Sequence, residues 1–296
     1  MFSGRAGLEF TWFKRVTSDI IVNEPLPPSL GSSNSRAQNL GEAQTTGFEI
    51  GLGATVLSTD QLVWDINVSG SRLRSELNEL GLVGVDFLGT TERHAPGFPL
   101  GSSWDYPVTW ADSNGDGMIA TSEVTIAAER EYIGPGLPQR EFSLSSTLRF
   151  GNLLQVYALI DHQGDYIAYN NTEGFRCQFR VCRARIDVNA PLWDQARHVA
   201  RDLAASRSQE GYREVGTFTK LREVSLTFFL PRSVASRFQS TGASLTVSAR
   251  NLITWTDYTG IDPEINRSGS SDNFGTSEFL TQGIPRYVTV RLNLTF

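Results

Sequence analysis

An all-β fold, part of a transmembrane antiparallel β-barrel, is the fold class that the sequence predicts. Apolar and polar residues alternate along many segments, which is the period of a β-strand and not that of an α-helix. Charged residues stand in the middle of the polar faces, as a water-filled lumen requires. The connections between the segments are alternately short and long, which is typical of barrels that cross an outer membrane.

About nine strands are expected from the alternation. The clearest case is the end of the chain, where Val288, Val290 and Leu292 share one face and Thr289 and Arg291 share the other. A barrel strand crosses a bilayer with roughly 10 residues, a length that most of the segments reach. The expected strands cover residues 5–14, 18–23, 38–57, 61–80, 141–149, 153–165, 217–230, 242–256 and 285–296.

The connections between these strands form two groups. Short ones lie near 16–18, 58–61, 151–152 and 231–242, and long ones cover 24–37, 81–140, 166–216 and 257–284. Because short turns face the periplasm and long loops face the outside, we expect 81–140 and 166–216 to be long extracellular loops. An odd strand count with the last strand running down puts the C-terminus on the periplasmic side. Glu9, Glu49 and Asp65 would line the lumen.

Composition and motifs exclude several classes of function. Two Cys and three His leave little material for a multi-ligand zinc, haem or iron–sulfur site. The net charge of -6 argues against nucleic-acid binding. Residues 1–15 carry no signal-peptide pattern, and no segment approaches the roughly 18 apolar residues of a membrane helix. No nucleophile motif accompanies the histidines, so we expect neither an enzyme nor catalytic residues.

Residues 112–123 fit the twelve-residue calcium-loop pattern position by position. Oxygen atoms of the Asp112, Asn114 and Asp116 side chains would point inward. The backbone carbonyl of Met118 would add a ligand, and Glu123 would close the shell with both carboxylate oxygens. We therefore expect a structural Ca²⁺ that braces the long loop. A tight turn without a metal is the alternative.

Cys177 and Cys182 lie in the expected loop 166–216. The outer surface of a cell is oxidising, so a disulfide is favoured over free thiols. The chain must turn between the two cysteines, because five residues in extended form are too long to be bridged. A zinc site is not expected, since no histidine stands near them in the sequence. Residues 194–210 look like a helix within the same loop.

Five aromatic residues of the long loops are candidates for a platform on which sugars stack. They are Trp104, Tyr106, Trp110, Tyr166 and Tyr169. Each combines a flat apolar ring with a polar group at its tip, which suits an amphipathic ligand. Packing of these rings within the loops themselves is an equally good interpretation.

Four segments resemble SusC/RagA-type TonB-dependent outer-membrane receptors. Residues 250–264 (RNLITWTDYTGIDPE) look like that family's Asn-Leu…Thr-x-Tyr-x-Gly-x-Asp-Pro-Glu strand and loop. Residues 221–231 resemble its Leu-Arg strand that ends in Leu-Pro, and 284–296 resemble its Pro-Arg and closing strand. Residues 39–49 resemble its Asn-x-Gly and Gly-x-Glu strand. The terminal Phe296 resembles the aromatic signal that barrel-assembly machinery reads.

The resemblance implies the C-terminal barrel portion of such a receptor, about nine strands of a larger 22-stranded barrel in the cell outer membrane. It implies that the plug domain and the TonB box are absent from residues 1–296. The whole receptor would take up glycans or other bulky nutrients such as peptides. Its partners would be outer-membrane lipid, a SusD-like surface lipoprotein and the TonB complex, reached through the plug.

A secreted β-sandwich module that binds calcium and carbohydrate is the alternative to this interpretation. Strands of a sandwich also alternate, because one face of each sheet packs on the core. A sandwich, however, has turn signals every 8 to 12 residues or so, roughly evenly spaced along the chain. The long connections 81–140 and 166–216 argue against this spacing.

Overall fold

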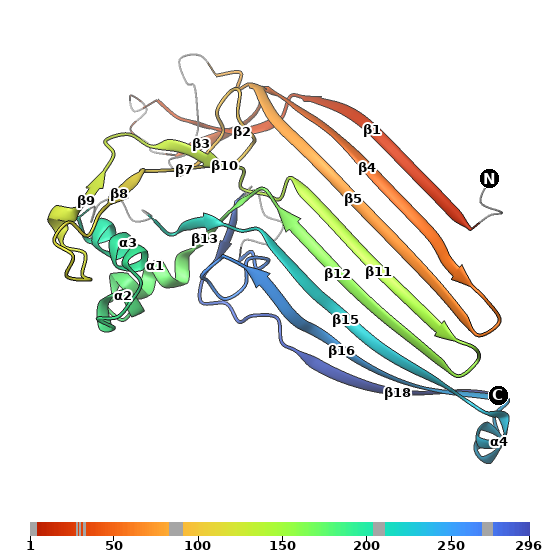
Figure 1. Cartoon of the computed structure of the whole chain (residues 1–296). Helices are drawn as coiled ribbons and strands as arrows, with labels where there is room; N and C mark the ends of the chain where they lie inside the picture. Colours follow the sequence, from red (N-terminus) through yellow and green to blue (C-terminus); the bar gives the residue numbers. More distant parts are fainter. Residues whose placement is uncertain are drawn as a thin grey trace.

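The computed structural model describes residues 5–27, 29, 31, 34–82, 91–203, 211–267 and 275–296. Its main element is an eight-stranded sheet with the order β1-β4-β5-β11-β12-β15-β16-β18 (Figure 1). Each strand is antiparallel to its neighbours. The predicted all-β, antiparallel fold class is confirmed.

The strands of the main sheet follow one another along the chain, because each pairs with the next of the set. They are β1 (Ala6–Ser18), β4 (Glu42–Ser58), β5 (Leu62–Glu79), β11 (Arg140–Phe150), β12 (Leu154–Gly164), β15 (Phe218–Leu230), β16 (Gly242–Thr256) and β18 (Tyr287–Thr295). These bounds agree within a few residues with the alternating segments of the sequence. The up-and-down order needs only connections between adjacent strands.

The register of the pairing sorts side chains onto two faces. Phe10 lies opposite Ile50, and Phe142 continues this row two strands further on. The three side chains are 64%, 39% and 40% exposed, although they are large and apolar. Soluble monomers rarely leave an apolar area of this extent uncovered. This face of the sheet therefore has the character of a lipid-facing surface.

The expected strand 18–23 is not part of the main sheet, and this prediction is wrong. β1 continues to Ser18, which lies opposite Glu42 of β4. The strand ends at Asp19, whose φ of 55° is left-handed, a conformation that Asp tolerates better than most residues. After it, β2 (Ile21–Pro25) and β3 (Ser35–Asn39) form a two-stranded sheet of their own.

The corrected strand count changes the direction of the first strand. The segment 16–18 belongs to a strand and is not a short turn, so three short connections remain, at 59–61, 151–153 and 231–241. The last of them holds the helix α4 (Arg232–Ala235). In Figure 1 both termini lie at the end of the sheet where these short connections lie, as an even number of strands requires.

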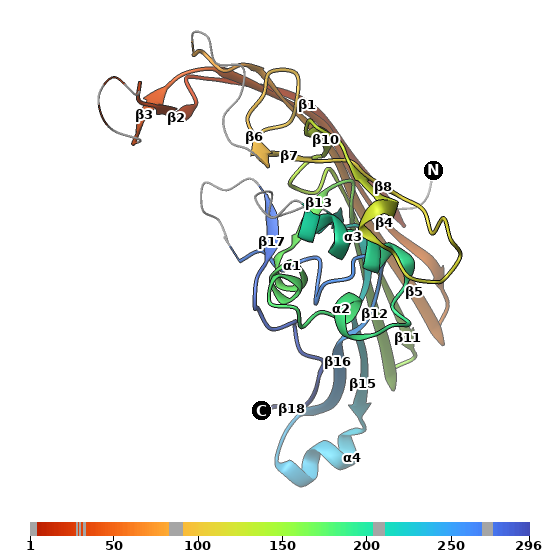
Figure 2. The ribbon, with the colours of Figure 1, turned by 90° about the vertical axis from the view of Figure 1, so that its left-hand side faces the viewer.

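The long connections build small structures at the opposite end of the sheet. The three longest of them, between β5 and β11, between β12 and β15 and between β16 and β18, are called the first, second and third long loops. The first contains β6 (Glu92–Arg93), β7 (Ser102–Asp105), β8 (Val108–Trp110), β9 (Val124–Ile126) and β10 (Glu131–Gly134). The second contains β13 (Ile167–Asn170), α1 (Asn171–Gln178), α2 (Arg183–Ile186), α3 (Leu192–Leu203) and β14 (Arg213–Val215), and the third contains β17 (Thr276–Glu278). Figure 2, seen from the loop end, shows the three helices in front of the sheet.

The buried core lies among these loops. One apolar cluster joins Ile119 and Val124 of the first long loop to Ala196 and Ala200 of α3. A parallel pair of β13 with β17 links the second loop to the third. The predicted helix 194–210 is present as α3 up to Leu203, and 204–210 lie outside the described residues. Among the residues described, no helix is both long and apolar enough to cross a membrane.

Candidate functional site

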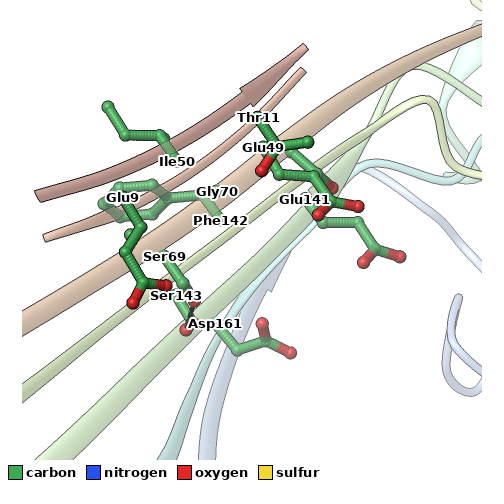
Figure 3. A pocket seen from close by; sticks show the side chains of 12 residues that line it. Glu9, Thr11, Glu49, Ile50, Ser69, Gly70, Glu141, Phe142, Ser143 and Asp161 are labelled. Atoms are coloured by element: carbon green, nitrogen blue, oxygen red, sulfur yellow. Dashed lines mark hydrogen bonds between the residues drawn. The ribbon is translucent and has the colours of Figure 1, made fainter. Parts of the chain in front are cut away.

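Polar side chains from five neighbouring strands line a hollow of about 420 Å³ on one face of the main sheet (Figure 3). The register explains this, because Glu9, Ser69 and Ser143 lie in one row across β1, β5 and β11. The polar residues of the lining are Glu9, Thr11, Glu49, Ser69, Ser71, Glu141, Ser143 and Asp161. Ile50, Gly51, Gly70 and Phe142 also line the hollow, although the pairing register puts Ile50 and Phe142 in the apolar row described above. Carboxylates and hydroxyls at this density accept hydrogen bonds from water or from a polar solute. This is the character that a wet lumen wall needs.

The five candidate stacking residues do not form one platform, and this prediction is corrected. Tyr166 is 2% exposed and Tyr169 is 7% exposed, so their ring faces are not open to a sugar. The physical reason is that the long loops build cores of their own and use tyrosines to fill them. Trp104 packs edge-on against Phe98 at 4.9 Å between ring centroids. Tyr106 lies below the guanidinium of Arg130, whose central carbon is 4.5 Å from the ring centroid.

Trp110 is the candidate that remains open, with 40% of its surface exposed. It lines a second hollow at the loop end together with Trp193, which the sequence analysis did not single out. Trp193 is 45% exposed and stands on α3. Polar groups of Arg197, Glu214 and Thr259 also line this hollow. Two indole rings beside charged and hydroxyl groups make a surface that suits an amphipathic ligand.

The expected calcium loop is closed by hydrogen bonds from its own backbone. The two carboxylate oxygens of Asp112 accept from the amides of Gly115 at 2.8 Å and Gly117 at 3.0 Å. Glu123 accepts from the amides of Ser113 at 2.7 Å and Ala120 at 2.9 Å.

Asn114 and Asp116 take part in the same closure. The carbonyl oxygen of the Asn114 side chain accepts from the amide of Asp116 at 3.0 Å, and the Asp116 carboxylate accepts from the amide of Met118 at 2.8 Å. The predicted ligand residues thus share one tight loop. Gln195 of α3 holds this loop by donating to the carbonyl of Gly117 at 3.2 Å.

Cys177 and Cys182 are joined by a disulfide, with an S–S distance of 2.09 Å. The turn that the short spacing demands is made at the end of α1, where Arg180 has a left-handed φ of 62°. The sulfur atoms lie beside His198 of α3, which is 3% exposed. Burial is the main cause that lowers the pKa of the His198 imidazole below its ordinary value.

A largely buried network of charges connects the third long loop to the main sheet. The ammonium of Lys220 on β15 donates to both carboxylate oxygens of Asp262, at 2.7 and 2.8 Å, and to Glu264 at 2.7 Å. Arg222 donates to both oxygens of Glu264, each at 2.7 Å. It also donates to Asp161 of β12 at 2.6 Å. The Lys220 side chain is only 3% exposed, so its charge depends on these partners.

Aromatic packing supports this network from the side. Tyr166, Phe218 and Tyr258 form a buried cluster with Ala168. The hydroxyl of Tyr166 donates to the carbonyl of Pro263 at 3.0 Å, between the two acidic residues of the network. Burial is the main cause that raises the pKa of the Tyr166 hydroxyl, and the neighbouring carboxylates Glu264 and Asp262 raise it further, so the group stays protonated as a donor.

Comparisons with known proteins show which proteins this chain is similar to. No protein-family model matches the chain. Two curated proteins of Formosa agariphila, TonB-dependent receptors P26 and P3, are each 24% identical over 339 and 345 residues, covering 100% of this chain and 33% of each receptor. A third, TonB-dependent receptor P39 of the same organism, is 21% identical and covers 92% of the chain and 32% of that receptor.

Solved structures give the same result. The structure of the RagAB peptide transporter matches 100% of this chain and 34% of its own, with a TM-score of 0.74 and 20% sequence identity. The RagAB peptide importer in its 'open-open' state matches 100% of this chain and 33% of its own, with a TM-score of 0.72 at the same identity. The chain has the fold of the part of the RagAB structures that it matches, and it is similar in sequence to TonB-dependent receptors. It spans about a third of the length of these relatives.

The buried network explains two of the receptor-like motifs. Leu221-Arg222 supplies the guanidinium, and Asp262-Pro263-Glu264 supplies both carboxylates and the carbonyl that Tyr166 reaches. The two motifs are far apart in the sequence and meet only because β15 and β16 are neighbours in the sheet. The receptor-type motif residues therefore anchor the third long loop to the strands of the main sheet. Lys220 was not expected to take part, because nothing in its local pattern indicates a buried partner.

Acidification is expected to release this anchor. Burial raises the pKa of the Glu264 carboxyl, but the hydrogen bonds from Arg222 and Lys220 more than offset this, so its net pKa lies below the ordinary 4.5. A lowered pKa in the folded state stabilises the fold above pH 4.5, and this contribution is lost as the pH falls through the lowered value. As the pH falls below 4.5, the hydrogen-exchange rates of the Ile265 and Arg267 amides, each divided by its intrinsic rate, should rise.

The variant Glu264→Gln should lose the same anchor at neutral pH. We expect the free energy of local opening of 261–267 to fall by roughly 2 kcal/mol, which makes amide exchange about thirtyfold faster. The increase in exchange on acidification should become smaller in this variant. Glu24→Gln is the matched control, because its carboxylate pairs with Arg36, whose side chain is 61% exposed. Unchanged exchange in Glu264→Gln, or an equal effect of Glu24→Gln, would show that the network does not hold the loop.

Proposed function

We propose that this chain forms barrel wall and outer loops of an outer-membrane TonB-dependent receptor that imports a bulky nutrient, a glycan or a peptide. The observation that carries the proposal is the two-sided sheet: one face exposes large apolar side chains, and the other carries the polar hollow of Figure 3. Lipid on one side and a wet lumen on the other account for both faces. The whole-chain likeness to TonB-dependent receptors supports the same function.

The position of the chain within such a receptor is part of the proposal. We place it at the C-terminal end of the barrel, as its closing motif indicates. The support is β18, which alternates up to the aromatic Phe296, 82% exposed. An exposed aromatic at the end of an alternating strand suits the interface between lipid and water. The long loops, 81–140 and 166–216 among them, would then face the outside of the cell.

Partners of the whole receptor follow from the same placement. A SusD-like surface lipoprotein would meet the outer loops, and the TonB complex would act through the plug domain of the whole receptor. Solved structures of similar fold are those of the RagAB peptide transporter and importer, which supports a peptide as cargo here. We propose the hollow between Trp110 and Trp193 as a place where the cargo touches the outer loops.

The alternative of a secreted β-sandwich is not supported. The main strands form one sheet of eight, and a sandwich needs two sheets packed face to face. The apolar face that would fill a sandwich core is instead exposed, with Leu8 at 67% and Val288 at 67%. The relatives are named as receptors, and the similar solved structures as a transporter or importer. Catalytic activity therefore has no support from them.

Membrane fractionation tests the proposed function. When the chain is expressed with its native upstream region, we expect recovery in the outer membrane and a band whose gel mobility shifts on heating. A closed barrel resists detergent until heated, because every backbone hydrogen bond is satisfied within it. Recovery as a soluble species whose gel mobility does not change with heating would contradict the proposal.

We further propose that residues 112–123 bind Ca²⁺ and so brace the first long loop. Its ligands would be the side chains of Asp112, Asn114, Asp116 and Glu123 and the backbone carbonyl of Met118. Support comes from the tight loop that these residues share and from its attachment to α3 through Gln195.

Adding Ca²⁺ should therefore protect residues 112–123 from proteolysis, and a chelator should remove the protection. Asp112→Asn removes a charged ligand and should weaken the effect by at least about tenfold in Ca²⁺ concentration. Asp60→Asn, in the short turn between β4 and β5, is the matched control. Equal cleavage with Ca²⁺ and with chelator would refute calcium binding.

A further inference from the structure

The disulfide and a histidine form a buried cluster among the three loop helices. Cys177 comes from α1, Cys182 directly precedes α2, and His198 comes from α3. The three residues are 1%, 0% and 3% exposed. They come together because α3 packs back against α1 and α2. In the sequence His198 is distant from both cysteines, so the local pattern gave no sign of a histidine beside them.

The imidazole of His198 is left without a hydrogen-bond partner. Neither ring nitrogen has one, although the atoms are buried. The nearest acidic group is Asp202, whose carboxylate oxygen is 3.6 Å from Nε2. Buried polar side chains are nearly always hydrogen-bonded. An imidazole with two free nitrogens beside two sulfur atoms therefore calls for another interaction.

The donor atoms of this cluster match those of a zinc site. Both Sγ atoms and a ring nitrogen of His198 lie within 4.8 Å of one another. In the part of the chain that the structure describes, no other three residues among His, Cys, Asp and Glu come together in this way. Cysteine thiolates and a neutral imidazole are the ligands that Zn²⁺ takes in tetrahedral sites.

We propose that Cys177, Cys182 and His198 form a zinc site that opens when the disulfide is reduced. A dithiol reductant passes two electrons and two protons to the S–S bond, which breaks to two thiols while the reductant becomes a disulfide. Zn²⁺ then displaces both thiol protons and binds two thiolates and the imidazole. The same two cysteines therefore hold either a disulfide or a metal ion. This site is independent of the proposed nutrient uptake.

The required movement is small. Two thiolates on one tetrahedral Zn²⁺ stand about 3.8 Å apart, and the Cα atoms of Cys177 and Cys182, 4.7 Å apart, are close enough to allow this. The fourth position is left to a water molecule, and Asp202, whose carboxylate oxygen is 3.6 Å from Nε2 and whose side chain is 46% exposed, stands at the edge of the site. That exposure also gives the ion a path inward. Arg180 and Arg185 bring positive charge near His198, and Asp194 and Asp202 lie close enough to offset it.

Cobalt titration tests the proposal, because Co²⁺ reports thiolate ligands by a sulfur-to-cobalt charge-transfer band and tetrahedral geometry by visible bands. The purified protein in detergent is reduced with a phosphine, freed of reductant under argon and titrated with Co²⁺, then with Zn²⁺. We expect one Co²⁺ per chain with both bands, and Zn²⁺ should abolish them. The unreduced protein should show neither.

His198→Asn should weaken Co²⁺ binding by roughly tenfold or more, because it removes one ligand. His162→Asn is the matched control, since His162 stands on β12 and its Nδ1 pairs with Thr219. Heat-dependent gel mobility checks that both variants fold. If His198→Asn fails to fold, a second measurement on the reduced wild-type protein takes its place. Zn²⁺ should protect the two thiols from an alkylating reagent. No charge-transfer band in the reduced protein, no protection by Zn²⁺, or equal binding by a folded His198→Asn would overturn the proposal.

Discussion

The pairing register of the main sheet is the constraint on which the rest of this structure depends. In lipid, each backbone donor and acceptor must be paired within the protein, which an antiparallel sheet achieves for every strand between its two edges. With the side-chain period of two, a slip of one residue would exchange the two faces completely. Phe10, Ile50 and Phe142 would then face the lumen, and Glu9 and Glu49 would face lipid. The apolar and polar rows thus hold every strand in one register.

The apolar side chains of the long loops are covered by protein and not by lipid. The loops bury these side chains against one another, so the clusters around Ile119, Tyr166 and Cys177 lie beyond the strand ends. Charged groups then connect this layer to the sheet. Lys220 and Arg222 extend from β15 and hold Asp262 and Glu264 of the third loop. The third long loop is therefore joined to the main sheet by ion pairs.

The barrel strands could be predicted from the sequence because their alternation is a local signal. β16 was expected over 242–256 and spans Gly242–Thr256. The alternation predicts a first strand that ends at residue 14, with a short turn near 16–18, but β1 continues to Ser18 and the chain turns at Asp19. The loop contacts could not be predicted, because they join residues distant in sequence. Lys220 with Asp262 and His198 with the cysteines are of this kind, and Tyr166 gave no local sign that it would be buried.

The central claim is that one face of the sheet meets lipid and the other meets water. Nitroxide labels placed one at a time at residues 7–12 of β1 test it most directly, with the protein in a bilayer. Cys177 and Cys182 are bonded to each other and do not take the label. The account predicts that oxygen reaches the labels at 8, 10 and 12, and that a water-soluble nickel complex reaches those at 7, 9 and 11. Accessibility without a period of two, or with the opposite phase, would contradict it.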